Sequence, residues 1–230
     1  MASTDKRETD MSDKKKSVFK GAIFDVDGVI VDTAHIHHKS WEIVFKKYGI
    51  NFTFKDFKSK VDGKPRAFGA KTILPEATDE EIRKICGEKQ GHFERILKTG
   101  KIKVFKTTVD FIKMLKKKGI KLAMASSSKN AAPILKKVKI YPYFDAEVEG
   151  ALLTKGKPHP DIFLIAAKKL KLKPSECIVF EDAQIGIDAA VNAKIKCAAI
   201  NRDKSHLITG ADIRVGDFKH LSFKKIQDLF

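Results

Sequence analysis

Two aspartates separated by one residue, in the run Asp25-Val26-Asp27-Gly28, follow a mostly apolar stretch at residues 18–24. Side chains two residues apart share a face of a strand, and where the chain leaves the sheet both carboxylates can reach one small volume. Two carboxylates in this arrangement suit covalent phosphoryl transfer. One is ionised as nucleophile and metal ligand, while its neighbour stays protonated as an acid or base. The alternative is a turn rich in Asp and Gly that carries no chemistry.

Polar residues follow other apolar segments in the same way. Ser126 ends one such segment, the pair Glu181-Asp182 ends another, and Lys157 lies in a loop between them. Each has a structural alternative: a helix N-cap for Ser126, a turn for Lys157 and a cap of the next helix for the acidic pair. The carboxyl ends of parallel strands meet at one edge of a sheet. Polar residues that recur at these ends therefore predict a single site.

The elements that must position these residues change in character along the chain. After the first strand at 18–24, apolar residues at helical spacing predict only helices up to residue 100, at 33–48, 52–57, 65–74 and 78–97. After residue 100, strands expected at 121–126, 146–148, 177–180, 197–200 and 213–215 alternate with helices at 108–118, 129–137, 159–170 and 184–192. This order predicts an α/β fold with a doubly wound, Rossmann-like parallel sheet and an inserted, all-helical cap domain.

The same pattern sets the expected domain boundaries. Residues 18–33 and 100–230 form the α/β core, and residues 34–99 form the helical cap. Residues 1–17 are polar and charged and lack the apolar core of a signal peptide, so we expect a flexible N-terminal extension there.

Composition narrows the class of protein. A chain of 230 residues with 43% hydrophobic residues can bury a substantial core, and it holds no apolar run near the ~20 residues that span a membrane. The net charge of +17 is spread over solvent-facing lysines without interleaved aromatics, which argues against nucleic acid as the main partner and favours anionic small molecules. Cys86, Cys177 and Cys197 form no paired framework, so we expect buried thiols in a cytoplasmic protein, and we expect a monomer.

The four segments, in this order, resemble the motifs of the haloacid dehalogenase superfamily of aspartate-nucleophile phosphotransferases, in the subgroup with a helical cap. The likeness covers residues 18–230 and is greatest to the β-phosphoglucomutases. It implies a Mg²⁺-dependent phosphotransferase that acts on small sugar phosphates through an aspartyl-phosphate intermediate. A sugar-phosphate phosphatase with the same core is the alternative. A basic binding module that keeps the fold without using the site is a third hypothesis.

The resemblance assigns roles in the core residue by residue. Asp25 matches the nucleophile, Asp27 the acid/base, Ser126 the hydroxyl that bonds the transferring phosphoryl group, and Lys157 the ammonium that offsets charge beside it. Glu181 and Asp182 match the acidic pair of the magnesium site, which Asp25 and the backbone carbonyl of Asp27 complete. A dianionic phosphate needs such cations before it can approach several carboxylates. Glu181 has the alternative of only orienting the site.

The resemblance also assigns substrate-binding residues outside the core motifs. Thr33 and His37, one helical turn apart, match positions that couple sugar binding and cap closure to Asp27. The remaining positions match a second phosphate site and its surroundings: Arg66 and Lys89 from the cap, and Ser128, Lys129 and Asn130 from the core. Solvated helix charges are the alternative for Arg66 and Lys89.

Other features leave alternatives open or depart from the family pattern. The histidine-rich helix start around His37 has two other interpretations: a surface segment, or a chance metal site formed with His35 and His38, which have helical spacing. Trp41 is expected in the cap core rather than as a sugar platform. Phe105-Lys106-Thr107 replaces the usual aromatic-Pro-Gly turn, and Gly69 stands where the mutases have a serine.

Overall fold

A six-stranded parallel sheet forms the centre of the computed structural model, which describes residues 18–62, 64–202 and 207–230. Its strand order is β5-β4-β1-β6-β7-β8, with all neighbours parallel. The strands are β1 (Gly21–Phe24), β4 (Lys121–Ser126), β5 (Ala146–Glu149), β6 (Cys177–Glu181), β7 (Lys196–Ile200) and β8 (Ile213–Val215). The predicted doubly wound α/β fold is therefore confirmed.

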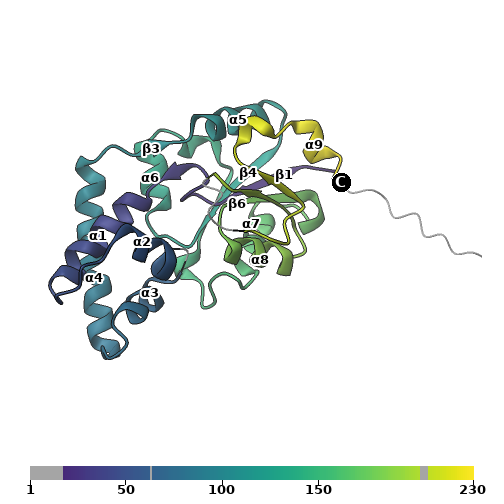
Figure 1. Cartoon of the computed structure of the whole chain (residues 1–230). Helices are drawn as coiled ribbons and strands as arrows, with labels where there is room; N and C mark the ends of the chain where they lie inside the picture. Colours follow the sequence, from purple (N-terminus) through teal and green to yellow (C-terminus); the bar gives the residue numbers. More distant parts are fainter. Residues whose placement is uncertain (1–17, 63, 203–206) are drawn as a thin grey trace, which may run out of the picture.

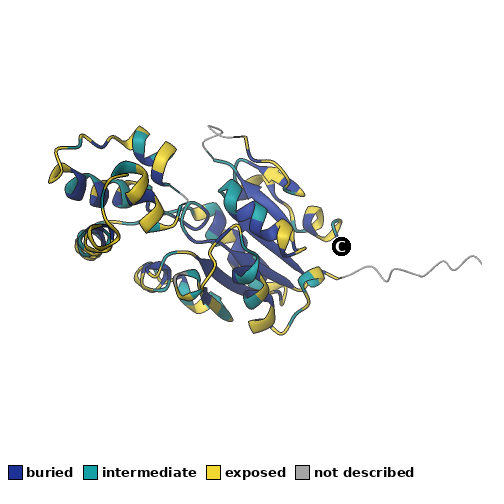
Figure 2. Cartoon of the chain, turned by 90° about the horizontal axis from the view of Figure 1, so that it is seen from below, coloured by how far each residue is buried: buried dark blue, intermediate teal, exposed yellow. Residues whose placement is uncertain are grey.

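Helices cover both faces of the sheet, as Figure 1 shows. They are α5 (Lys106–Lys117), α6 (Ala131–Lys137), α7 (Asp161–Lys169), α8 (Gln184–Asn192) and α9 (Phe223–Gln227). Successive β1 residues point to opposite faces, so Ala22 and Phe24 join the core under α5, α6 and α9, whereas Ile23 joins the core under α7 and α8. The central strands β1 and β6 are consequently buried along their whole length, whereas the edge strands β5 and β8 carry exposed charged residues. Figure 2 shows the sheet between helices with exposed outer faces.

The four other helices lie between β2 (Val31–Asp32) and β3 (Lys103–Val104), two short antiparallel strands at the crossings into and out of this segment. They are α1 (Ala34–Lys46), α2 (Phe54–Asp56), α3 (Arg66–Ile73) and α4 (Asp79–Thr99), with a π-helical turn, η1 (Phe57–Val61), after α2. The helix expected at 52–57 thus begins at Phe54 and continues beyond Phe57 as this π-helical turn. The segment has its own apolar core, in which Trp41 stacks on Phe45 at 5.0 Å, as expected for a core residue.

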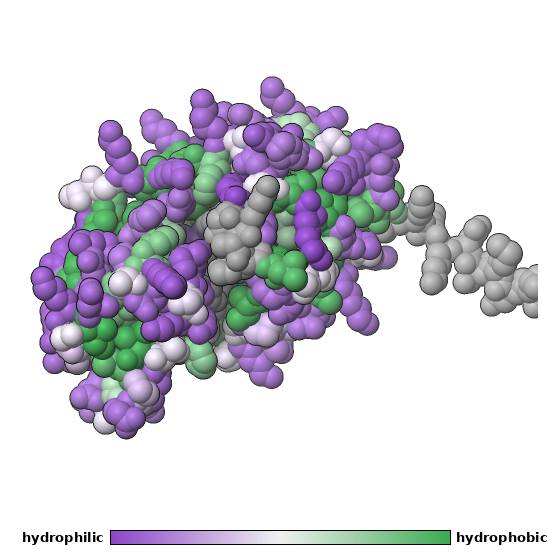
Figure 3. Space-filling model, in the orientation of Figure 1, coloured by the Kyte–Doolittle hydropathy of each residue, from purple (hydrophilic) through white to green (hydrophobic). Residues whose placement is uncertain are grey.

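Local sequence explains where these helices begin. Thr78 and Glu81 form a reciprocal capping box at the start of α4, and Thr53 and Asp56 form another before α2. The predicted extension at 1–17 lies outside the described residues, and the domain boundaries stay a prediction. Among the described helices, none combines the length and apolarity needed to cross a bilayer. Hydrophilic side chains cover most of the face drawn in Figure 3.

Candidate active site

The carboxyl ends of β1, β4 and β6 place the predicted catalytic residues at one edge of the sheet. In the parallel register, Phe24 lies beside Met124 of β4 and Phe180 of β6. Asp25 follows β1, and its N–H donates to the carbonyl oxygen of Phe180 at 3.0 Å. The strands therefore fix the acidic residues that follow them relative to one another.

Lys157 joins two of these strand ends through buried ion pairs. Its Nζ donates to Oδ1 of Asp25 at 2.6 Å and to Oε1 of Glu181. Burial raises the pKa of Asp25 to about 7, against the lowering effect of Lys157. Although burial favours the neutral amine, the carboxylates of Asp25 and Glu181 raise the pKa of Lys157 above its ordinary value. The lysine is thus a fixed cation beside Asp25, the predicted nucleophile.

Asp27 has different surroundings from Asp25. It accepts a hydrogen bond from Oγ1 of Thr33, a buried residue that directly precedes α1. Burial raises the pKa of Asp27, whereas the Thr33 hydrogen bond and the charge of Lys89 lower it. A carboxyl with a raised pKa and one directed partner suits proton transfer rather than nucleophilic attack.

Glu181 is held by hydrogen bonds on both oxygens. Oε1 accepts from Lys157, and Oε2 accepts from the backbone N–H groups of Asp182 and Ala183 at 2.9 and 3.0 Å. A Cβ on Gly186 would lie 1.9 Å from Oε1, so only glycine leaves room for this carboxylate. These contacts favour the alternative in which Glu181 orients the site.

Asp182 packs against the loop that carries the two aspartates. A Cβ on Gly28, whose φ is +80°, would lie 1.8 Å from its Oδ2. Burial raises the pKa of Asp182 well above its ordinary value, and the charges of Glu181 and Asp25 add to this effect. The carboxyls of Asp25, Glu181 and Asp182 thus have Lys157 as their shared cation. A divalent cation would balance the remaining negative charge.

The side chains here do not form a protein-only metal cage. In the described part of the chain, no group of three or more His, Cys, Asp or Glu side chains is arranged to hold a metal. Lys157 bonds to both Asp25 and Glu181. The oxygens that fit Mg²⁺ are those of Asp25 and Asp182 with the backbone carbonyl of Asp27, a hard donor set that leaves positions for water and phosphate.

Residues from the helical segment form a second, cationic group. Nζ of Lys89 lies 2.7 Å from Nδ1 of His37 and over the rings of Phe93 and Trp41, at 4.7 and 5.6 Å from their centres. Lys89 is only 2% exposed, so it is not a solvated helix charge. Burial lowers its pKa to about 7, and the Arg66 charge contributes to this fall.

The charges of this group act on one another. Burial lowers the pKa of His37 well below its ordinary value, and the neighbouring charges of Lys89 and Arg66 add to this effect. Burial also lowers the pKa of Arg66, which is partly buried. In the part of the chain that the structure describes, no carboxylate lies in hydrogen-bond contact with Lys89 or Arg66, and cations in such surroundings suit an anionic ligand.

His35 and His38, the other two histidines at the start of α1, also pack against aromatic rings. The His35 ring stacks on Phe54 at 4.6 Å, and Nε2 of His38 lies 3.1 Å from the carbonyl oxygen of Phe52. The described residues contain no metal-binding histidine group. Aromatic packing therefore accounts for this histidine-rich helix start.

The predicted core side of the second phosphate site lies opposite α4. Backbone N–H groups of Ser128 and Asn130 donate to Oγ of Ser126 and Ser128, at 3.1 and 3.2 Å. The Asn130 side chain pairs with that of Gln90, whose Nε2 lies 2.8 Å from its Oδ1. Lys129 faces Glu94 of α4 at 4.0 Å.

Sequence reasoning missed Gln90, a buried polar residue beside Lys89 on α4. Its polarity on an inward-facing helix surface was the available signal. At Gly69, a Cβ would lie 2.9 Å from Cγ1 of Val61, so the serine of the mutases would need that valine to shift.

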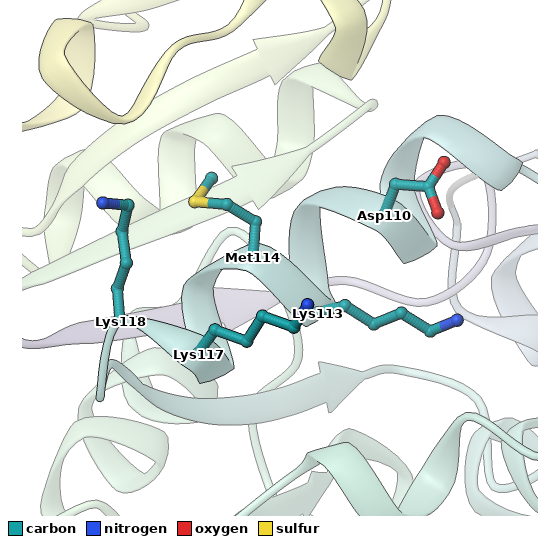
Figure 4. Close-up of a pocket in the computed structure, with 5 residues that line it drawn as sticks. All are labelled: Asp110, Lys113, Met114, Lys117 and Lys118. Atoms are coloured by element: carbon teal, nitrogen blue, oxygen red, sulfur yellow. The ribbon is translucent and has the colours of Figure 1, made fainter.

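The hollows on α5 are separate from these groups. One of about 470 Å³ is lined by Asp110, Lys113, Met114, Lys117 and Lys118. Figure 4 shows their side chains spread along the helix rather than converging. A second hollow, of about 410 Å³, extends from Asp110 and Lys113 towards Tyr143. Neither contains a residue of the strand-end cluster, so we place no catalytic function there.

The chain belongs to the haloacid dehalogenase-like hydrolase family, whose sequence model matches residues 19–194. It is 33% identical over 217 residues to the β-phosphoglucomutase of Bacillus subtilis, with 91% of this chain and 94% of that protein covered. It is 31% identical over 205 residues to a phosphorylated carbohydrates phosphatase of Thermotoga maritima, with 84% and 92% covered. A crystal structure of β-phosphoglucomutase from Clostridium difficile has a TM-score of 0.82 at 29% identity, with 91% of this chain and 96% of that chain covered. The predicted family and the likeness to the β-phosphoglucomutases are confirmed.

Proposed function

We propose that this chain is a Mg²⁺-dependent phosphotransferase of small sugar phosphates that works through an aspartyl-phosphate intermediate, in the manner of a β-phosphoglucomutase. The observation that carries the proposal is the pairing of Asp25 with Lys157 beside the separately held Asp27. One carboxylate is set next to a fixed cation and the other next to a hydroxyl donor. This division of environments matches the two roles that covalent phosphoryl transfer requires.

In the first half of the reaction, an oxygen of Asp25 attacks phosphorus and the bond to the leaving sugar oxygen breaks. Asp27 gives its proton to that oxygen. Lys157 offsets the charge between the nucleophile and the phosphoryl oxygens, and Ser126 donates a hydrogen bond to them. Mg²⁺ held by Asp25, Asp182 and the Asp27 carbonyl would supply further positive charge to the phosphoryl group.

In the second half, Asp27 removes the proton from a sugar hydroxyl, which attacks the phosphorus on Asp25. Thr33 holds the Asp27 carboxyl in place for both proton transfers. We propose residues 34–99 as the cap that excludes water from the intermediate, so that a sugar receives the phosphoryl group.

A mutase also needs a second anion site, since its intermediate carries two phosphates. We propose that Lys89 and Arg66, together with His37 of α1, bind this phosphate or the sugar from the cap side. Ser128, Lys129 and Asn130 complete the site from the core. Among the described residues, no carboxylate forms a hydrogen bond with the buried Lys89 or the partly buried Arg66, which supports this assignment.

The second candidate is a sugar-phosphate phosphatase, in which Asp27 activates water instead of a sugar hydroxyl. The Thermotoga maritima relative is the finding that favours it. Supplying β-glucose 1-phosphate with a trace of glucose 1,6-bisphosphate separates the two. Formation of glucose 6-phosphate without free phosphate supports the mutase, whereas free phosphate alone supports the phosphatase.

A variant control tests whether the site acts at all. Asp25→Asn should abolish turnover of every phosphate ester. Asp110→Asn, which changes an exposed acidic residue of α5, should leave turnover intact. Turnover that survives in the Asp25 variant would contradict both enzyme proposals.

A further inference from the structure

Arg202 lies just beyond the carboxyl end of β7, and its side chain contacts the loop that follows the two aspartates. Nη1 donates to the carbonyl oxygen of Gly28 at 2.6 Å, and Nη2 lies 3.3 Å from that of Val29. In the sheet, one strand, β6, lies between β7 and β1. The guanidinium therefore spans the strand that carries Glu181 and Asp182.

The same side chain also contacts the second crossing between the sheet and the helical segment. The guanidinium carbon lies 3.7 Å from the centre of the Phe105 ring, and Nη2 donates to Oγ1 of Thr108 at 2.8 Å. Thr108 in turn donates to the Val29 carbonyl at 2.8 Å, and the Phe105 N–H donates to the Ile30 carbonyl at 3.0 Å. Arg202 thus connects the core strand β7 to the two segments that flank the helical region, one before β2 and one after β3.

A further acidic contact fixes the guanidinium itself. Nε lies 3.5 Å from Oδ2 of Asp217, and the charge of Asp182 also faces the arginine. Thr107 donates to the same Asp217 oxygen at 2.9 Å. The planar guanidinium has donors in several fixed directions, so it can bond two carbonyls and a hydroxyl while its face covers a ring.

We infer that Arg202 is a positioning residue, which sets the Gly28-Val29 peptide and through it the Asp27 carboxyl and the geometry of both crossings. Gly28 directly follows Asp27, and it packs so closely against Asp182 that a Cβ would not fit between them. A small shift of the Gly28-Val29 peptide therefore moves the carboxylates of both Asp27 and Asp182. Phe105, the aromatic residue of a turn that otherwise departs from the family pattern, provides the ring that the guanidinium covers. The inference rests on the proposed roles of Asp25 and Asp27.

Steady-state kinetics of Arg202→Ala test this inference on any phosphate ester that the wild-type protein turns over. Because misplacement of reacting groups by about 1 Å can cost 100-fold in rate, we expect kcat to fall about 10- to 100-fold with KM nearly unchanged. Guanidinium chloride at millimolar concentration should restore part of the lost kcat. Arg214→Ala, at an exposed position on β8, is the matched control and should keep wild-type kcat with no response to guanidinium.

Two outcomes overturn the inference: a kcat of Arg202→Ala within twofold of wild type, or a loss confined to KM. If this variant does not fold, as judged by circular dichroism, Phe105→Leu takes its place. This change removes the ring under the guanidinium and should lower kcat about 3- to 10-fold. A wild-type kcat in Phe105→Leu would contradict the inference. A wild-type protein that hydrolyses esters without transferring phosphate between sugars contradicts only the mutase proposal, so the two failures are distinguishable.

Discussion

Replacing Lys89 with methionine should stabilise the fold while weakening the binding of anions. Burial lowers the pKa of Lys89 from 10.5 to about 7. At about 1.36 kcal/mol for each tenfold change, the protonated lysine destabilises the folded chain by at most about 5 kcal/mol at pH 6. Contacts with the rings of Phe93 and Trp41 offset about 1 to 3 kcal/mol of this. We therefore expect Lys89→Met to be about 2 to 4 kcal/mol more stable than wild type at pH 6.

The direction of the pH dependence follows from proton binding. Between pH 7 and 10.5 the unfolded chain keeps a proton that folded Lys89 has released, so this group makes wild-type stability rise with pH. Charged or titratable groups face Lys89 from His37 on α1, Arg66 on α3, Asp27 after β1 and Cys86 on α4. All of them remain in the variant. The stability advantage of Lys89→Met should therefore shrink by about 2 to 3 kcal/mol between pH 6 and pH 9.

Urea unfolding followed by circular dichroism at pH 6, 7, 8 and 9 measures this difference. Lys84→Met, an exposed change on the same helix, is the control and should show no comparable pH dependence. An unchanging difference between wild type and Lys89→Met, or a less stable variant at pH 6, would refute the reasoning. In parallel, the KM of Lys89→Met for sugar phosphates should rise, because a cation of the proposed second anion site is gone.

Three other changes have defined outcomes. Thr33→Val removes the hydroxyl that lowers the pKa of Asp27, so kcat should fall about 10-fold and its acid limb should move to higher pH, while Thr33→Ser should keep both. Gly186→Ala places a Cβ 1.9 Å from Oε1 of Glu181 and should reduce kcat at least about 100-fold. Its control, Gly87→Ala, lies in open space on α4 and should add about 1 kcal/mol of stability without changing kcat. Chelation by EDTA should abolish turnover, and added Mg²⁺ should restore it; turnover that persists in EDTA would count against the metal proposal.

The sequence predicted the fold and the strand-end residues because both depend on local patterns. Asp25 and Glu181 follow continuous apolar runs, and parallel strands place such positions at one edge whatever the connecting loops do. The capping box at Thr78 likewise needs only neighbouring residues. These features required no knowledge of which distant segments meet.

Other features depend on contacts between distant parts of the chain. The pairing of Gln90 with Asn130 joins α4 to the start of α6, and Arg202 bonds a loop 173 residues away. No periodicity or motif in a single sequence encodes such pairs. The two-residue strands β2 and β3 are too short for an alternating pattern, so their pairing was also beyond reach. The position of Arg202 directly after a buried strand was the one usable signal.

The most direct test of the proposed chemistry is to locate the transferred phosphoryl group. Metal-loaded protein would be mixed with a sugar phosphate, quenched in acid, digested and mapped by mass spectrometry. We expect phosphorylation of the peptide that holds Asp25, and none in Asp25→Asn. Phosphate found on another residue, or an unmodified Asp25 peptide during active turnover, would contradict the role of Asp25 as nucleophile.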